Sequence, residues 1–274
     1  MPWMDWVLKS NPLITYFGES TSKSAAFSAS LVNKRAAQLQ TFAEKGLDPG
    51  PRNFIDRFLE AKTAHPKVVD DRQVVVYTNT NVTAGSDTTA ISLRAVVYFL
   101  LKHPEALQNL MRELQDANLS SPVTWKESQA LPYLGAVVQE SFRLHPAVGY
   151  NLERVVPPKG FRMDDGTFIS GGSQVAMNAW VVHLDPVFGA EPKRFKPERW
   201  LKGEHEDEAT YKARIAGMKR ADLTFGHGSR TCIGKNISLL EIYKLIPSLL
   251  LKFRLELVGG EEKVWKTKNK WFVY

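Results

Sequence analysis

The only cysteine of the chain, Cys232, lies in a ten-residue run that constrains the fold more than any other stretch. The run is FGHGSRTCIG, residues 225–234, and a long apolar segment follows it. A lone cysteine is usually a small core hydrophobe, but that interpretation explains neither the glycines of the run nor Arg230. Glycines let backbone N–H groups approach a sulfur atom closely, and the start of a helix stabilises negative charge on it. The run therefore predicts a thiolate ligand for a metal, with Arg230 pairing with an anionic group of the cofactor.

This run resembles the haem-binding loop of the cytochrome P450 family, whose pattern is Phe-x-x-Gly-x-Arg-x-Cys-x-Gly. Every fixed position of the pattern is filled, by Phe225, Gly228, Arg230, Cys232 and Gly234. The resemblance implies that haem b is the cofactor, that Cys232 is the axial thiolate of its iron, and that Arg230 contacts a haem propionate. A thiolate in that place donates electron density to the iron and favours cleavage of the O–O bond.

A second unusual stretch lies inside residues 70–102, whose pattern predicts one helix that ends before His103-Pro104. At about 1.5 Å per residue the helix would be about 50 Å long. Its middle is rich in threonine and asparagine, and such side chains inside a helix need polar partners or a wet cavity. Hydroxyl groups that bond back to the helix's own carbonyl groups are the structural alternative.

Residues 84–89 of this helix, AGSDTT, match the oxygen-activation motif of the cytochrome P450 family. The small residues Ala84 and Gly85 would let a flat cofactor or substrate lie against the backbone. The resemblance further implies that Thr88 hydrogen-bonds dioxygen at the iron and that Asp87 relays protons from solvent.

A third motif pairs Glu140 with Arg143, three residues apart on one helix face. Such a pair is often a surface ion pair worth about 0–1 kcal/mol. In the family it forms a buried network with an arginine from a later loop. Residues 197–200, PERW, match that loop, so Arg199 is the expected third member, with a structural role.

Arg154 lies in a predicted short strand, residues 152–156. Relatives often place a second propionate-binding arginine there, which makes Arg154 a candidate cofactor ligand. An exposed strand arginine without a special role is the alternative, and both interpretations stay open.

The order of predicted elements indicates a mainly α chain with small β-sheets, an α+β class. A long central helix and a cysteine haem loop are the marks of the cytochrome P450 fold that the resemblance implies. Charged residues 203–220 predict an exposed insertion, and the apolar segment 237–253 predicts a helix buried nearly all round. Further strands are predicted within residues 173–182 and over 255–274.

Charge and composition narrow the classes of partner. Lys and Arg total 36 against 29 Asp and Glu, a net charge of +7, which suits an acidic protein, an anionic lipid surface or a nucleic acid. No dense basic run with interleaved aromatic residues is present, so nucleic acid is the weakest of these and is not expected. A single cysteine excludes an intrachain disulfide, and no stretch reaches the 18 or so apolar residues of a membrane span.

Members of the family are about twice as long as this chain of 274 residues. We therefore expect residues 1–274 to be a single, incomplete cytochrome P450 domain that corresponds to the C-terminal portion and lacks the N-terminal half. A full-length relative would lie at the cytoplasmic face of the endoplasmic reticulum membrane, held by the absent N-terminal anchor; the location of this chain itself is left open. Runs such as NAWVVH at residues 178–183 resemble filamentous-fungal members related to pisatin demethylases, which act in fungal secondary metabolism.

The resemblance implies a haem-thiolate monooxygenase that inserts one atom of O2 into a small apolar organic substrate. An NADPH-dependent reductase would supply the electrons, and part of the basic excess would form its docking face. One alternative is a haem-thiolate isomerase or dehydratase on the same fold, against which Asp87 and Thr88 argue. A second is a non-catalytic truncated fragment, and a third is a basic nucleic-acid binder supported by charge alone.

Overall fold

A computed structural model describes residues 19–260, 264–269 and 271–273. The chain divides into two compact units, one ending at Ser86 and the other beginning at Asp87. Helix α5, Asp71–Lys102, begins in the first unit and ends in the second. Its bounds confirm the predicted helix over residues 70–102, and Asp70 caps its start by accepting a hydrogen bond from the backbone N–H of Gln73 at 2.7 Å.

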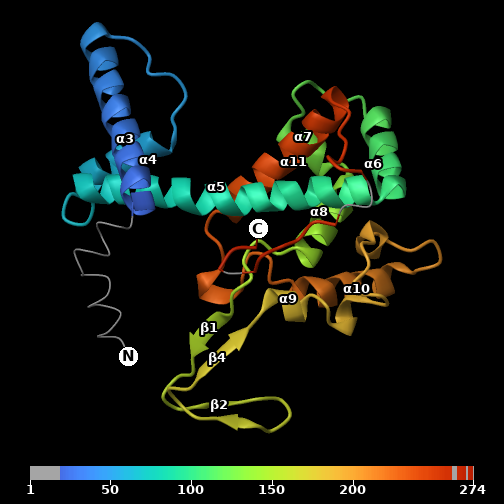
Figure 1. The fold of residues 1–274 in the computed structure, drawn as a ribbon. Helices are drawn as coiled ribbons and strands as arrows, with labels where there is room; N and C mark the ends of the chain where they lie inside the picture. Colours follow the sequence, from blue (N-terminus) through green and yellow to red (C-terminus); the bar gives the residue numbers. More distant parts are fainter. Residues whose placement is uncertain (1–18, 261–263, 270, 274) are drawn as a thin grey trace. The chain divides into compact units, whose positions relative to one another are not determined.

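The first unit contains α3, Glu19–Lys45, and α4, Phe54–Ala64, besides the start of α5 (Figure 1). A buried ion pair joins the two helices, because the Arg35 guanidinium donates to both carboxylate oxygens of Asp56, at 2.7 and 2.9 Å. This hydrogen bonding lowers the pKa of Asp56 below its ordinary value. The apolar core of the unit centres on three buried valines, Val32, Val69 and Val74.

Three threonines in the first half of α5 bond back to carbonyl groups of the helix itself, which is the structural alternative for these side chains. The hydroxyl groups of Thr78, Thr80 and Thr83 donate to the carbonyl groups four residues earlier, at 2.9, 2.8 and 2.8 Å. Each such bond satisfies the hydroxyl group within the helix itself. These three side chains therefore need no further polar partner.

Helices of the second unit enclose its main core. They are α6, Pro104–Asp116; α7, Trp125–Gln129; α8, Pro132–Leu144; and α11, Lys235–Lys252. A capping box starts α7: the Thr124 hydroxyl accepts from the N–H of Glu127, whose carboxylate accepts from the N–H of Thr124. The largest core cluster draws fully buried residues from all but α7 and from the end of α5, among them Leu100, Leu110, Leu134, Ile242 and Ile246.

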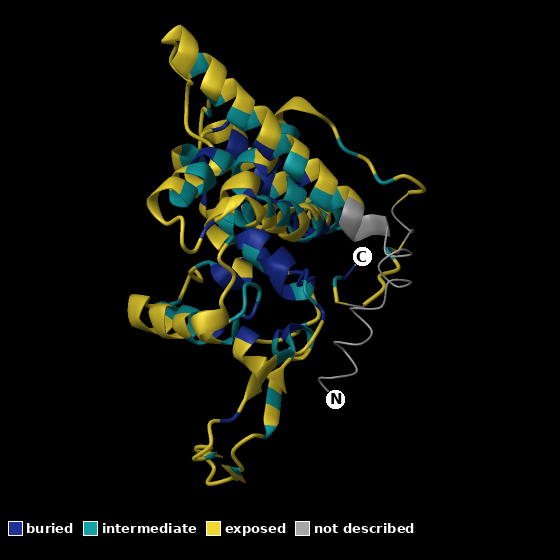
Figure 2. Cartoon of the chain, turned by 90° about the vertical axis from the view of Figure 1, so that its left-hand side faces the viewer, coloured by how far each residue is buried: buried dark blue, intermediate teal, exposed yellow. Residues whose placement is uncertain are grey.

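Two small antiparallel sheets lie between α8 and α11 in the sequence. Strand β1, Leu152–Val155, pairs with β4, Gln174–Met177, so that Leu152 faces Met177. Strand β2, Phe161–Arg162, pairs with β3, Phe168–Ile169, and this hairpin is largely exposed (Figure 2). Together with the helices, the sheets confirm the predicted α+β class.

Short helices fill the remaining connections of the second unit. They are α9, Ala179–Val182; η1, Pro186–Phe188; η2, Pro197–Trp200; α10, Glu208–Ala221; and η3, Gly228–Arg230. The strand predicted within residues 173–182 ends at Met177, because the Asn178 side chain accepts from the N–H of Trp180 and starts α9. None of the helices in the described part of the chain has the length and apolarity needed to cross a bilayer.

Two predictions about the second unit were wrong, and a third was incomplete. Residues 203–220 are mostly exposed, as predicted, but they form most of α10, whose Met218 is buried against Phe188 and Trp200. Helix α11 is not buried all round: Leu240 and Leu245 are 42% and 46% exposed, because its core contacts come from the side that carries Ile242 and Ile246. No strand forms within the described part of residues 255–274, where only isolated bridges occur.

Candidate functional site

The loop around Cys232 is closed by its own backbone. The N–H of Cys232 donates to the carbonyl oxygen of Phe225 at 2.8 Å, and the Thr231 hydroxyl donates to the same oxygen at 3.2 Å. Gly226 and Gly228 have φ values of +70° and +71°, in the left-handed region that other residues adopt at a cost. The glycines therefore serve the turn that returns the chain to Phe225 and leaves Cys232 at its end.

The thiol of Cys232 lies exposed just before α11. Gly234 is the N-cap of that helix, and a Cβ atom at this position would lie 3.8 Å from the Cys232 sulfur. The first N–H groups and the dipole of a helix favour negative charge in this place. The geometry therefore suits a thiolate that is accessible to a metal.

Phe225 anchors the loop to the core. Its ring packs edge-to-face on Phe142 of α8, with centroids 5.9 Å apart and an interplanar angle of 85°. On the other side the Lys235 ammonium group lies 5.5 Å from the ring centroid. Phe225 thus joins α8, the loop and α11, which makes it a packing residue rather than a donor to a ligand.

Two exposed arginines accompany the thiol. Arg230 lies in η3 of the loop itself. Arg154 extends from β1, and its guanidinium donates to the carbonyl oxygens of Glu153 at 2.7 Å and of His227 at 3.3 Å. Arg154 therefore lies against the cysteine loop, as a second cofactor-binding arginine would, although its role stays a prediction.

The loop residues fit the group that the sequence suggests. A flat metallated ring with carboxylate side chains needs a sulfur donor, cations for its carboxylates and apolar contacts for its face. The exposed thiol of Cys232 provides the donor, and Arg154 and Arg230 provide two cations. Ile233, next to the thiol, is fully exposed and provides an apolar side chain.

The threonine-rich motif of α5 is joined to α11 by a hydrogen bond. The Thr89 hydroxyl donates to Ser238 Oγ at 3.2 Å, and Ser238 lies in the first turn of α11, where its N–H donates to the carbonyl oxygen of Gly234. The last residue of the motif is therefore held one turn away from the cysteine loop. Ser238 could not be predicted from the sequence, because a single serine in a helix carries no signal of a partner so far along the chain.

The other members of the motif lie on both sides of the unit boundary. Ala84 and Gly85 are exposed residues of the first unit. Asp87 and Thr88 are half-buried residues of the second unit, directly before the buried Thr89. The roles of these four residues stay predictions.

Glu140, Arg143 and Arg199 form one buried cluster. Glu140 Oε1 accepts from Arg143 at 2.7 Å and from Arg199 at 2.8 Å, and its Oε2 accepts a second bond from Arg143 at 2.8 Å. The N–H of Lys196 adds a bond to Oε1 at 3.0 Å. The indole N–H of Trp200 completes the shell by donating to Oε2 at 2.9 Å. Trp200 directly follows Arg199 in the PERW motif, yet the sequence analysis gave it no role.

Two guanidinium groups share this one carboxylate, so the cluster carries an excess positive charge. Backbone carbonyl groups accept the remaining N–H donors of Arg143, at His183 (2.7 Å) and Pro192 (2.6 Å). Arg199 likewise donates to the carbonyl oxygens of Phe188, Glu191 and Arg194. Because every buried charge has hydrogen-bonding partners, the cluster fixes η2 and the segment around it against α8.

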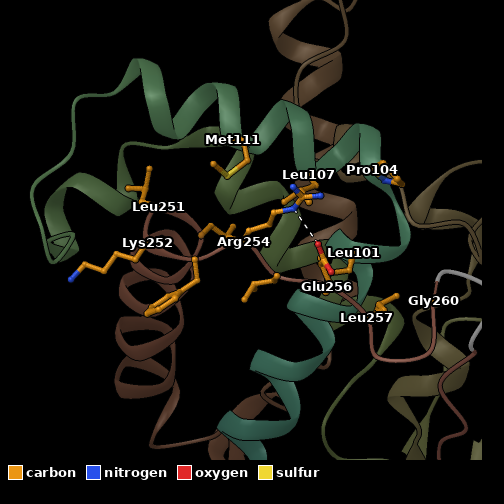
Figure 3. Close-up of a pocket in the computed structure, with 13 residues that line it drawn as sticks. Leu101, Pro104, Leu107, Met111, Leu251, Lys252, Arg254, Glu256, Leu257 and Gly260 are labelled. Carbon is orange, nitrogen blue, oxygen red and sulfur yellow. Dashed lines mark ion pairs between the residues drawn. The ribbon is translucent and has the colours of Figure 1, made fainter.

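A cavity of about 690 Å³ lies elsewhere in the second unit (Figure 3). Its lining comes from the end of α5, the first half of α6, the end of α11 and residues 253–257 and 260. The ion pair of Arg254 with Glu256, 3.2 Å long, is the dashed contact in Figure 3. Neither Cys232 nor any residue of the three motifs lines this cavity, so it is not part of the candidate site.

Comparison with known proteins gives a match along nearly the whole chain. The family model described as Cytochrome P450 matches residues 2–273. The chain is 43% identical to the cytochrome P450 monooxygenase cicH of Emericella nidulans, over 100% of this chain and 53% of that protein. It is 39% identical to a pisatin demethylase of Fusarium vanettenii, over 85% of this chain and 42% of that protein. The chain spans about half the length of the curated relatives it matches.

Proposed function

Because the chain belongs to the cytochrome P450 family, we propose that it carries the cysteine-ligand part of a haem-thiolate monooxygenase. The reaction inserts one atom of O2 into an apolar organic substrate and reduces the other atom to water. The observation that supports it most is the exposed thiol of Cys232 before α11, on a helix whose Ser238 is hydrogen-bonded to the threonine motif of α5. Relatives named as monooxygenases support the same reaction class.

The cofactor in this proposal is haem b, and residues of the second unit hold it. The Cys232 sulfur would ligate the haem iron, while Arg154 and Arg230 would pair with the carboxylates of the haem. Phe225 keeps the loop against the core through its contact with Phe142. When bound, the haem supplies the redox chemistry that activates O2, favoured by the electron density of the thiolate.

Asp87 and Thr88 handle protons in this proposal. The Asp87 carboxylate is half-buried, so it can exchange a proton with solvent and pass it inward. The Thr88 hydroxyl, one residue further along α5, would direct its proton toward the place that O2 occupies. Thr89 fixes this turn of α5 against α11 through its bond to Ser238.

The electron donor in this proposal is an NADPH-dependent reductase with an acidic docking face. The net charge of +7 supports a partner of opposite charge. We expect reductase-driven turnover to fall as ionic strength rises; turnover that does not depend on salt would count against this docking. For a full-length relative, the same proposal expects a location at the cytoplasmic face of the endoplasmic reticulum membrane.

The test is incubation of the haem-loaded chain with a reductase, NADPH and labelled O2 over a panel of apolar substrates. Methylated compounds come first in the panel, because one relative is named a pisatin demethylase. The proposal expects product only when O2 and NADPH are both present, with one labelled oxygen atom incorporated into the substrate carbon that is attacked. Product formed without O2 would indicate an isomerase or a dehydratase instead.

A further inference from the structure

His183 is a buried histidine with a hydrogen bond at each ring nitrogen. Only 1% of the surface of His183 is exposed to solvent. Nδ1 lies 3.0 Å from the carbonyl oxygen of Arg143, and Nε2 accepts from the backbone N–H of Leu223 at 2.8 Å. Because a backbone N–H only donates and a carbonyl only accepts, the ring must carry its proton on Nδ1. The two backbone partners therefore fix one neutral tautomer of His183.

One of these bonds attaches His183 to the Glu140 cluster. Arg143 donates from its guanidinium to the carbonyl oxygen of His183 at 2.7 Å, and His183 donates from its ring to the carbonyl oxygen of Arg143. Each residue thus binds the backbone of the other. Since Arg143 is itself held by Glu140, the imidazole is fixed to the buried Glu140 cluster.

The other bond reaches the entry of the cysteine loop. Leu223 is buried and stands two residues before Phe225. Its neighbour Asp222 accepts from the N–H of Thr224 at 2.9 Å, and the same carboxylate oxygen lies 3.5 Å from His183 Nε2. Residues 222–224 are therefore gathered around the imidazole, immediately before the residue whose carbonyl group holds the N–H of Cys232.

We propose that His183 is a positioning residue that fixes the cysteine loop to the Glu140 cluster. The proposal rests on the proposed function, in which Cys232 is the iron ligand. A change in Leu223 would move Phe225, and the carbonyl oxygen of Phe225 holds Cys232 in place. His183 therefore sets where the thiolate stands without touching the haem.

The competing explanation is that His183 only fills space. Its ring packs edge-to-face on Phe188, with centroids 5.8 Å apart. A phenylalanine at this position would keep the packing and leave two buried backbone groups, at Arg143 and Leu223, without partners. Glutamine places a carbonyl oxygen near the site of Nε2 and keeps the acceptor for Leu223, whereas asparagine places an amide donor near the site of Nδ1 and keeps only the bond to Arg143.

The experiment compares His183→Phe, His183→Gln and His183→Asn in the chain without haem and with haem. Amide hydrogen exchange over residues 222–232 of the haem-free chain reports the loop directly. The ferrous carbon monoxide spectrum reports the fraction of bound haem with thiolate ligation. His145→Phe is the matched control, because His145 is also buried and packs on Trp180 and Trp265 instead of the loop.

We expect exchange in residues 222–232 to rise about tenfold in the phenylalanine and asparagine variants, because both lose the buried hydrogen bond to the N–H of Leu223. The glutamine variant should recover most of the protection, and its thiolate fraction should be the highest of the three. Equal exchange and equal thiolate fractions in the glutamine and asparagine variants would overturn the proposal, whether or not the phenylalanine variant folds. If haem binds without thiolate ligation even in the unchanged chain, the proposed function fails. The exchange data then still test whether His183 fixes the cysteine loop to the Glu140 cluster.

Discussion

Thr89 on α5 and Ser238 on α11 are joined by a hydrogen bond of 3.2 Å between their hydroxyl oxygens, although 149 positions separate them in the chain. Thr89 is 7% exposed, so the bond is shielded from solvent on that side. It connects the run AGSDTT to the first turn of α11, which directly follows the cysteine loop. These two motifs are far apart in the sequence. The relationship indicates that the two motifs are positioned together.

The first prediction concerns this bond. Thr89→Val keeps the shape of the side chain and removes the donor, so we expect a loss of about 1 kcal/mol in the free energy of unfolding. Ser238→Ala should cost a similar amount, and the double variant should cost clearly less than the sum. Denaturant unfolding of the four chains measures this coupling.

Thr83→Val is the matched control for α5. The Thr83 hydroxyl bonds to carbonyl oxygens of the helix itself, those of Asn79 and Thr80, and the residue is exposed. Its replacement should change stability by no more than about 0.5 kcal/mol. Additive effects of Thr89→Val and Ser238→Ala would contradict the coupling.

Local features of this fold are readable from the sequence. The helix over residues 71–102 follows from its starting acids and the His103-Pro104 stop, and the capping box of Thr124 and Glu127 depends on residues three apart. The same holds for Glu140 and Arg143, which share a helix face. The two pairs each lie within one helical turn, and the start and stop signals of the long helix stand directly at its ends.

Partners that lie far apart in the sequence could not be predicted, because the signals in the sequence are local. Ser238, Trp200 and His183 gain their roles only when segments far apart in the sequence meet. Helix α10 was not predicted, because the many charged residues of this segment obscure the period of its short apolar side, which includes the buried Met218. The exposed side of α11 was missed because an apolar composition does not tell which faces are covered.

The second prediction concerns Glu140. Glu140→Gln leaves Arg143 and Arg199 buried without a counter-charge, so we expect a loss of about 3–5 kcal/mol in the free energy of unfolding. Trp200→Phe removes the indole donor together with part of the buried ring system, and the lost bond to a charged group alone should cost about 1.5–3 kcal/mol. Thermal or denaturant unfolding compares the two, and a smaller loss for Glu140→Gln than for Trp200→Phe would contradict this assignment.

The third prediction concerns the pH dependence of stability. Burial lowers the pKa of His145 from 6.5 to about 4, with a smaller contribution from Arg94 in the same direction. Between these values the unfolded chain binds a proton that the folded chain does not, so stability falls as the pH falls from 6.5 toward 4. The loss from this group should be on the order of 3 kcal/mol.

His145→Phe removes this titration and should flatten the dependence in that range. The exposed His205 offers a control, because His205→Ala should leave the slope unchanged. Unfolding free energies measured at intervals from pH 7 to pH 4 give the slope. An unchanged slope in His145→Phe would show that another group is responsible.

The fourth prediction concerns the attachment of α10. Arg214 donates to both carboxylate oxygens of Glu206, at 2.8 and 2.7 Å, and to the carbonyl oxygen of Leu201 at 2.9 Å. Hydrogen bonding to Arg214 lowers the pKa of Glu206 to about 2. Arg214→Lys keeps the charge and loses the planar fork, so amide exchange in α10 should become faster.

Lys212→Met is the control for α10, since Lys212 makes only an exposed ion pair with Glu208. That variant should leave the exchange rates of α10 nearly unchanged. Equal exchange in the two variants would mean that the buried side of α10, and not Arg214, attaches the helix.

The central claim is that Cys232 is the thiolate ligand of a haem iron. The most direct measurement is the carbon monoxide difference spectrum of the reduced, haem-loaded chain beside that of Cys232→Ser. The account predicts a red-shifted Soret band typical of thiolate ligation in the unchanged chain and its complete loss in the variant. A red-shifted band that survives in Cys232→Ser, or haem binding without that band in the unchanged chain, would contradict it.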